Sequence, residues 1–490
     1  MFFRHNTRSN KDNQILIPMP FNDIKFWLIF PLIFIVYWAI PMRLRKLRNV
    51  FLLIVSYMLY MSWKPAFAIV LLAVTAITYC GGYLIGKQQD NRRKKTLCWC
   101  FALLGLLPLL VFKYYNFLNE SLTSLLSHAG LHFVLPGLNW AIPVGISFFT
   151  FQAVGYMLDV YHNRTRTERN FLDYALFVSF FPQVTSGPIS KAAELMPQIK
   201  SSHSFDYEQA KQGLKYFLWG MFLKVVLADR AGIYVDMVFD NYQKLPAINC
   251  LGTSFLYSIQ IYADFAGYSI MAVGTGKLLG FNLINNFNRP YFSVSVTDFW
   301  RRWHISLSRW LKDQIYIPLG GSRCSRAKNY LNILVTFIVS GIWHGANWTF
   351  IVWGVIHGLC QIVEKIFGWQ KKNYHGWSKA GRILLTFFIV NFAWVIFRSP
   401  SIGFATDFIA QSFAFNQGIS VSLDGKDTLL FVAVALIPFL TYETIREFAP
   451  KLYMHLKDKW YLRWAVYLCL SAMIFLNGVL DGGNFIYVNF

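Results

Sequence analysis

The sequence predicts an all-α polytopic membrane protein with about eleven to thirteen membrane helices, several of them short or re-entrant. Three observations predict this fold class. First, 55% of the 490 residues are apolar and only 14% are charged, whereas soluble domains carry roughly 25% charged residues. Second, apolar runs near the length of a bilayer-crossing helix recur along the chain. Third, Lys and Arg gather in short runs between them, as in loops that flank membrane spans.

The first membrane helix is expected just after a polar start. Residues 1–23 form a polar N-terminal segment, and the first apolar run covers residues 26–40. No small-residue cleavage site follows this run, so we expect it to stay in the membrane as an anchor. No Pro- or Ser-rich linker interrupts the later text. Residues 24–490 are therefore expected to form a single transmembrane domain.

The remaining candidate helices follow from the rule that about 20 mostly apolar residues cross a bilayer. Several runs are shorter than this and predict tilted or re-entrant helices. The candidates cover residues 24–40, 50–63, 66–85, 97–113, 172–184, 214–227, 251–273, 330–342, 348–366, 383–397, 429–442 and 464–480.

Two dense basic loops predict the orientation. One follows the first candidate helix (residues 43–48), and the other follows the third (residues 87–95). Because two helices separate these loops, both must lie on one side of the membrane. The preference of Lys and Arg for the cytoplasmic side makes that side the cytoplasm and places the N-terminus outside. Arg4, Arg8 and Lys11 argue the other way, but they are sparser.

Proline and glycine interrupt the apolar text in the middle of the chain. Irregular backbone at membrane depth is tolerated only where it is buried in protein or lines a cavity. The breaks therefore predict a central region built around a site or passage. They are Pro143, Gly145, Pro182, Gly187, Pro188, Pro290, Pro318, Gly320 and Gly321.

Charge and cysteine content exclude two other functions. The formal net charge is +22, which in a soluble protein would suggest nucleic-acid binding. Here the basic residues flank apolar runs, so we exclude nucleic acid as a partner and expect the lipid bilayer instead. The seven cysteines show no zinc-type spacing. We therefore expect buried free thiols and no metal site.

Residues 298–319, DFWRRWHISLSRWLKDQIYIPL, predict a tilted or partly buried helix near the membrane interface. Two interpretations are open. The first is an interfacial helix with snorkelling arginines, and the second is a basic wall that binds a phosphate-bearing donor. We favour the first from spacing alone, because basic interfacial helices are common. One face would carry Trp300, His304, Leu307 and Leu311, and another Arg301, Ile305, Ser308 and Lys312.

Residues 340–349, SGIWHGANWT, place His344 in strongly apolar text. Gly341 and Gly345 are spaced so that another backbone or a ligand can come close. An ionisable residue at membrane depth indicates a functional site, and a neutral imidazole can accept a proton from a hydroxyl. A hydrogen-bonded structural histidine between helices explains the residue equally well. His357 would face away from His344 if one helix continued through both, which argues against a metal pair.

Asp264, in IYADFAGYS, is a third ionisable candidate at membrane depth. Aromatic neighbours make an unpaired charge costly there. We favour a structural role, in which Asp264 pairs with a buried arginine or accepts hydrogen bonds, over a substrate-binding one.

Six motifs in this order resemble the membrane-bound O-acyltransferase family, and most of all its bacterial branch with the membrane subunit of alginate O-acetyltransferase. They span nearly the whole chain after the polar start, and the terminal FIYVNF also fits. Thr185 and Ser186 stand where relatives often have a more apolar pair, and Ala266 where serine is common. The motifs are PVGISFFTFQAVGYMLDVY from Pro143, FFPQVTSGPI from Phe180, IYADFAGYSIMAVGTGKLLGF from Ile261, NFNRPYF from Asn286, DFWRRWHISLSRWLKDQIYIPLGGSR from Asp298 and SGIWHGANWTFIVWGVIHG from Ser340.

The resemblance implies a many-helix fold around a central tunnel. An acyl thioester would enter the tunnel from the cytoplasm, and an acceptor hydroxyl would approach from the other side. The family's invariant histidine, in its WHGA-type motif, corresponds to His344, and the RWH motif supplies His304. His344 would act as general base. His304 would orient a substrate or stabilise developing charge.

From this resemblance we expect a bacterial inner-membrane enzyme that moves an acetyl group from cytoplasmic acetyl-CoA to a hydroxyl of an exported polysaccharide. A periplasmic SGNH-type partner is expected to complete the transfer. Acetyl-CoA would be a substrate, so no bound cofactor is expected. Asn347, taken as one turn from His344, is a candidate oxyanion donor. The candidates for the phosphates of coenzyme A are Arg301, Arg302, Arg309 and Lys312.

Three alternatives remain open from the sequence. The first is transfer of D-alanine or another acyl group from a carrier protein to a cell-envelope polymer. The second is a transporter or channel, which hydropathy and broken helices alone would also fit. The third is a non-catalytic scaffold for polysaccharide export, in which His344 would be replaceable.

Overall fold

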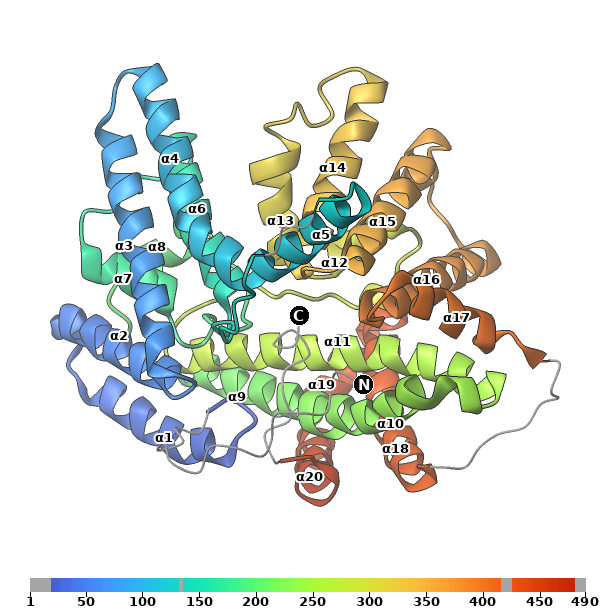
Figure 1. Ribbon diagram of the computed structural model, residues 1–490. Coiled ribbons are helices and arrows are strands. Elements are labelled where there is room, and N and C mark those ends of the chain that lie inside the picture. The colour runs from blue at the N-terminus through green and yellow to red at the C-terminus, as the bar shows by residue number, and fades with distance from the viewer. Residues whose placement is uncertain (1–18, 132–134, 416–424, 481–490) are drawn as a thin grey trace.

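The computed structural model describes residues 19–131, 135–415 and 425–480, and these residues form helices and no strand (Figure 1). Side chains at many N-termini cap the first turn. Asp23, for example, accepts from the backbone N–H of Lys25, and Asp206 accepts from those of Glu208 and Gln209.

The helices follow one another in chain order with short connections. Three segments within them have wider π-type turns, namely Leu110–Tyr114, Phe222–Ala228 and Lys312–Tyr316. The α-helices are α1 (Ile24–Ala39), α2 (Arg45–Met61), α3 (Pro65–Lys87), α4 (Asn91–Leu109), α5 (Tyr115–His128), α6 (Ile146–Tyr161), α7 (Phe171–Ser179), α8 (Ala192–Lys200), α9 (Tyr207–Met221), α10 (Asp229–Asn241), α11 (Ala247–Leu278), α12 (Val296–Arg302), α13 (Ile305–Leu311), α14 (Arg326–His344), α15 (Trp348–Ile366), α16 (Gly376–Arg398), α17 (Ile402–Ser412), α18 (Lys426–Phe448), α19 (Pro450–Asp458) and α20 (Trp460–Asn477).

Several of these helices are long and apolar enough to cross a membrane. Within the described residues five pass this test: α3, the continuous stretch Asn91–His128, α15, α16 and α18. A sixth is gained if the pair Ile24–Ala39 and Met42–Met61, bent by 105°, counts as one broken span. The helical membrane fold is confirmed, but length and apolarity alone give fewer spans than the expected eleven to thirteen. One expected span, residues 172–184, overlaps only the nine-residue α7, which ends at Ser179.

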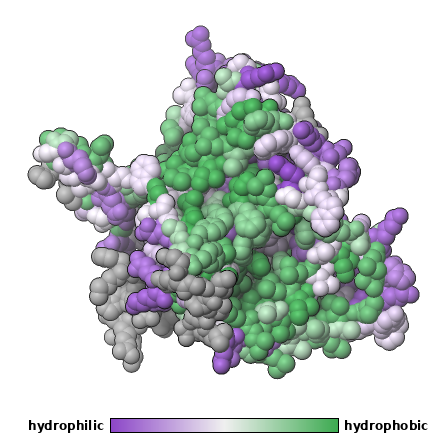
Figure 2. Space-filling view, turned by 90° about the vertical axis from the view of Figure 1, so that its right-hand side faces the viewer, coloured by the Kyte–Doolittle hydropathy of each residue, from purple (hydrophilic) through white to green (hydrophobic). Residues whose placement is uncertain are grey.

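Large apolar side chains are exposed on the molecular surface, as in a membrane protein. Leu28, Ile69 and Leu476 expose 73%, 69% and 79% of their surface. Figure 2 shows apolar side chains over most of one face, with hydrophilic side chains at its edges. Exposing such an apolar face to water would cost free energy, whereas contact with lipid does not. Buried apolar side chains from α1 through α20 form one core cluster.

A chain of polar contacts brings the two basic loops to the same end of the molecule, as the sequence predicts. Lys94 donates to Asn163 (3.0 Å), just after α6. Glu168, in the same loop, pairs with Lys200 (2.5 Å) at the end of α8. Arg45 donates to the neighbouring carbonyl of Ile199 (3.1 Å). We call this end, with residues 43–48, 87–95 and 162–170, the basic end.

Two tight helix pairs position the interior. In Figure 1, α9 and α11 run side by side across the lower half of the view, and α14 lies beside α15 in the upper half. A Cβ atom on Gly220 would lie 2.7 Å from the carbonyl oxygen of Gly267, so glycine is needed for this approach of α9 to α11. The expected role of Gly341 and Gly345 is confirmed in the same way, since a Cβ on either would collide with Phe350 of α15.

Candidate active site

His344 is the last residue of α14, and only 1% of its surface is exposed. Its ring lies edge-on to three aromatic rings, with centroid distances of 4.9 Å to Trp343, 5.0 Å to Trp353 and 5.1 Å to Phe397. The next residue, Gly345, has extended backbone and ends the helix. The imidazole therefore lies at a helix end, inside an aromatic wall.

His304 is also fully buried, but it does not lie within a helix. Its backbone is left-handed (φ 42°, ψ 54°), which separates α12 from α13. The expectation of one continuous helix over residues 298–319 is therefore wrong. Trp300 and Leu307 lie on separate short helices and form no single stripe with His304.

Hydrogen bonds to the NFNRPYF motif stabilise this break between α12 and α13. The N–H of Ile305 donates to the carbonyl of Asn286 (2.9 Å), and the N–H of Ser306 donates to Asn286 Oδ1 (3.1 Å). The N–H of Asn288 donates to the carbonyl of Arg302 (2.9 Å). Asn286 thus satisfies the first N–H groups of α13, as an N-cap would.

Trp343 brings the two histidines into one site. Its ring centroid lies 5.7 Å from His304 and 4.9 Å from His344. Phe148 of α6 completes this wall, at 5.3 Å from Trp343 and 6.1 Å from His304. Residues forty positions apart in sequence therefore share one aromatic cluster.

His357 reaches the same cluster, because α14 ends before it. Trp353 lies 5.0 Å from His344 and 4.8 Å from His357. The two histidines were expected to face apart only if one helix continued through both. They lie on two separate helices, so this expectation does not apply. Trp300 Nε1 donates to His357 Nδ1 (3.2 Å), so His357 has a clear packing role.

The four basic candidates fall into two groups. Arg301 and Lys312 are exposed. Arg302 pairs with Asp298 (3.1 Å) and with Glu447 of α18 (3.1 Å), and Arg309 pairs with Glu194 of α8. Burial opposes the charge of Arg302, but Asp298 and Glu447 outweigh it and raise the pKa of its guanidinium above the ordinary value. Two of the four cations are thus already neutralised by carboxylates.

Asp264 has the structural environment that the sequence favours, with a different partner. It lies on α11 with 1% of its surface exposed, and it pairs with Lys224 Nζ (2.5 Å), a lysine rather than an arginine. Lys224 also pairs with Asp229 (2.7 Å). This buried ion pair ties the π-type segment Phe222–Ala228 to α11.

Asn347 is the N-cap of α15. Its Oδ1 accepts from the N–H of Thr349 (3.0 Å), and its Nδ2 donates to the carbonyl of Pro400 (2.9 Å). The premise that it lies one helical turn from His344 is wrong, because α14 ends at His344. Its geometry is that of a cap.

Sequence reasoning missed two residues at the site, Lys113 and Tyr114. Lys113 Nζ donates to the carbonyls of Trp343 (2.9 Å) and His344 (2.8 Å). The hydroxyl of Tyr114 donates to the carbonyl of Ile342 (2.6 Å). The sequence did contain a signal for this site, a single lysine at the end of an apolar run. Ionisable residues at membrane depth usually have a functional role.

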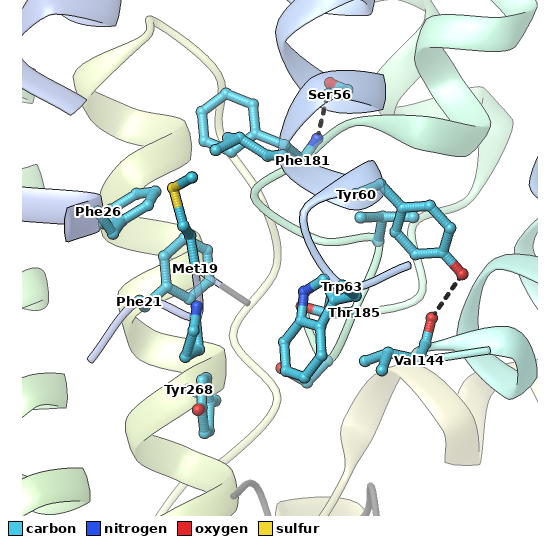
Figure 3. Close-up of a pocket in the computed structure, with 14 residues that line it drawn as sticks. Met19, Phe21, Phe26, Ser56, Tyr60, Trp63, Val144, Phe181, Thr185 and Tyr268 are labelled. Atoms are coloured by element: carbon cyan, nitrogen blue, oxygen red, sulfur yellow. Dashed lines mark hydrogen bonds between the residues drawn. The ribbon is translucent and has the colours of Figure 1, made fainter. Parts of the chain in front are cut away.

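Among the described residues, two cavities lie toward opposite ends of the molecule. The first is lined by aromatic side chains at the end opposite the basic end, where Tyr60 donates to the carbonyl of Val144 (2.8 Å) (Figure 3). Met19, Trp63 and Thr185 also line it. Neither histidine lines it, and the tunnel that the resemblance implies stays a prediction.

The second cavity lies toward the basic end and is more polar. Its lining residues include Lys191, Ser306, Arg309 and Asp313. Ser306 is two residues from His304, so this cavity reaches the turn that carries the histidine. Neither histidine is among its lining residues.

Fold and site together define a multi-pass helical membrane protein with histidines buried where helices end. The profile of the membrane-bound O-acyltransferase family matches residues 162–405. Over 402 residues the chain is 37% identical to the probable alginate O-acetylase AlgI of Pseudomonas syringae pv. tomato, covering 81% of this chain and 76% of the relative. The chain belongs to the membrane-bound O-acyltransferase family and is an O-acyltransferase.

Two further relatives are named for other activities. The chain is 36% identical over 414 residues to the peptidoglycan O-acetyltransferase of Helicobacter pylori, covering 78% of this chain and 77% of the relative. It is 27% identical over 356 residues to the teichoic acid D-alanyltransferase of Streptococcus thermophilus, covering 66% and 80%.

Proposed function

We propose that this protein transfers an acetyl group from acetyl-CoA to a hydroxyl of an exported cell-envelope polysaccharide. Acetyl-CoA would reach the protein at the basic end, in the cytoplasm, and the acceptor would approach from the opposite side of the bacterial inner membrane. A periplasmic SGNH-type protein would take the acetyl group from this protein and complete the transfer. Two relatives with acetylase or acetyltransferase names, at 36–37% identity, support the acetyl group and the polymer acceptor.

The observation that carries this proposal is the pair of buried histidines on Trp343. In the proposed reaction, His344 removes the proton of the attacking hydroxyl while its oxygen bonds to the thioester carbonyl carbon. The tetrahedral intermediate collapses, the C–S bond breaks, and the imidazolium returns the proton to the leaving thiolate. His304 would orient a substrate or stabilise the developing charge. General base assistance of this kind contributes typically 10²–10⁴-fold.

The aromatic cluster supports acyl transfer in a second way. A thioester is open to hydrolysis, and an apolar wall around the base limits the access of water. The donor's phosphates would lie outside this wall. Arg301 and Lys312 are exposed and suited to them, whereas Arg309 lines the cavity toward the basic end.

D-Alanyl transfer from a carrier protein is the second candidate, because a D-alanyltransferase is 27% identical to this chain. The chemistry at His344 would be the same, and only the donor and the acceptor would differ. The higher identity to acetyl-transferring relatives favours acetyl-CoA.

The test is donor use in inverted membrane vesicles that contain the protein and its polymer. Vesicles would receive either acetyl-CoA labelled in the acetyl group or D-alanine loaded on its carrier protein. We expect label from acetyl-CoA in the polymer or in a periplasmic protein, and only when this chain is present. Label from the carrier alone would replace the proposal by D-alanyl transfer. Label from neither, with folded protein and polymer present, would overturn both donor assignments.

A further inference from the structure

We propose that Lys113 is a positioning residue for the reaction: with Tyr114, it fixes the end of α14 and thereby the place of His344. This inference rests on the proposed role of His344 as general base. It concerns a side chain from a different part of the sequence, 231 residues away along the chain.

The local sequence presents Lys113 to α14 through an irregular helix. Pro108 near the end of α4 lacks an N–H group, and the π-type segment Leu110–Tyr114 follows it. A π-type turn contains an extra residue and redirects the side chains around it. Lys113 and Tyr114 therefore leave the apolar run 97–112 and reach a neighbouring helix.

Together the two side chains occupy three successive carbonyls at the end of α14. Tyr114 bonds to Ile342, and Lys113 bonds to Trp343 and His344. The last carbonyls of a helix have no partner within the helix, and a cation there also complements the negative end of the helix dipole. The residue that follows this end, Gly345, has an extended conformation.

The same ammonium ties this helix end to α6. Its third contact is Ser147 Oγ (3.4 Å), one residue before Phe148, which lies against His304 and Trp343. Lys113 Nζ also lies 5.9 Å from the centroid of the Trp343 ring, within the range of a cation–π contact. One side chain thus contacts the backbone of His344, the tryptophan between the two histidines, and the helix behind them.

These contacts predict a positioning role rather than general stabilisation. The carbonyl of His344 belongs to the same residue as the proposed base, so fixing it fixes the backbone position from which the imidazole extends. Misplacing a catalytic group by about 1 Å can cost 10²-fold in rate.

The test compares turnover and KM for acetyl-CoA in purified full-length variants. Lys113→Met removes all three bonds, and Lys113→Gln keeps an N–H donor. Lys277→Met is the matched control, because Lys277 lies in the last turn of α11 and contacts Asn282 (3.2 Å) and the ring of Tyr216, away from the site. We expect Lys113→Met to lower kcat about tenfold to a hundredfold, with KM within about threefold of wild type. The kcat of Lys113→Gln should lie between those of wild type and Lys113→Met. Lys277→Met should match wild type.

Unchanged kcat in Lys113→Met would overturn the inference, as would an effect confined to KM or one equalled by Lys277→Met. If Lys113→Met does not give folded protein, Lys113→Gln decides by the same criteria. His344→Gln, measured beside them, separates the two proposals. Its inactivity together with an active Lys113→Met would reject only the positioning role, whereas an active His344→Gln would reject the general base itself.

Discussion

His304 combines a proposed role for its side chain with an unusual backbone conformation. A left-handed conformation costs most residues roughly 1–2 kcal/mol, and only glycine, asparagine and aspartate adopt it readily. The two bonds from Asn286 support it here. Backbone strain at a buried histidine is typical of functional sites, where the surrounding structure enforces the conformation.

Substituting His304 separates the backbone requirement from the imidazole. His304→Asn tolerates φ 42°, whereas His304→Ala keeps the strain of the left-handed backbone and leaves the space of the buried ring empty. We expect the Asn variant to unfold near the wild-type temperature in detergent and the Ala variant to unfold at a lower one. Turnover should fall in both, because both lack the ring. Wild-type turnover in His304→Asn would show that only the turn matters.

The exposed and the paired basic residues are expected to have different roles. If Arg301 and Lys312 bind the donor's phosphates, the double variant Arg301→Ala/Lys312→Ala should raise KM for acetyl-CoA about tenfold and leave kcat nearly unchanged. Arg302→Ala should instead lower thermal stability, because it leaves Glu447, 8% exposed in its side chain, without this partner. An unchanged KM in the double variant would identify these two side chains as membrane-interface anchors.

At the scale of elements, the pair α14 and α15 sets the geometry around His344. A Cβ atom on Gly341 would meet the backbone carbonyl of Phe350, which cannot move like a flexible side chain. The two helices would have to separate near the histidine.

Gly341→Ala therefore tests this contact. We expect it to destabilise the protein by about 1–3 kcal/mol through overpacking and to lower turnover. Gly252→Ala on α11 is the control, because a Cβ there meets nothing within 4 Å. It should be neutral or slightly stabilising, since alanine favours helix. Thermal unfolding in detergent measures both, and equal effects would contradict the close approach.

Local sequence predicted some elements and missed others for physical reasons. Apolar periodicity and small-residue spacing are local, so α3, α15 and the approach at Gly341 could be expected. The break at His304 could not, because it depends on Asn286, eighteen residues earlier and outside the helical pattern. Likewise, Asp264 could be recognised as buried, but Lys224 could not be identified as its partner across forty residues. Lys113 could not be recognised because its partners are backbone carbonyls of α14, which the sequence around Lys113 does not reveal.

At the scale of the whole molecule, the chain has two chemically different ends. Contacts through Lys94 and Lys200 gather the basic loops at one end. Met19 and Trp63 line the cavity at the other, in agreement with the expected orientation of the first helix. His344 and His304 lie at helix ends and line neither cavity.

This arrangement predicts the sidedness of exposed loops. In a variant without its native cysteines, Gln89→Cys marks the basic end and Ala129→Cys marks the loop after α5. We expect an impermeant maleimide to label Gln89→Cys only in inverted vesicles and Ala129→Cys only in spheroplasts. Labelling of both from one side would contradict the topology.

The most direct test of the central claim is acetyl transfer by His344→Gln beside His357→Gln, both at matched amounts of folded protein. The two substitutions are of the same kind and affect buried histidines on the same ring, Trp353. His357 accepts a bond from Trp300, which glutamine can also accept. We predict loss of transfer by at least about 10²-fold in His344→Gln and retention of most activity in His357→Gln. Equal, near wild-type transfer by both variants would contradict the assignment of His344 as the general base.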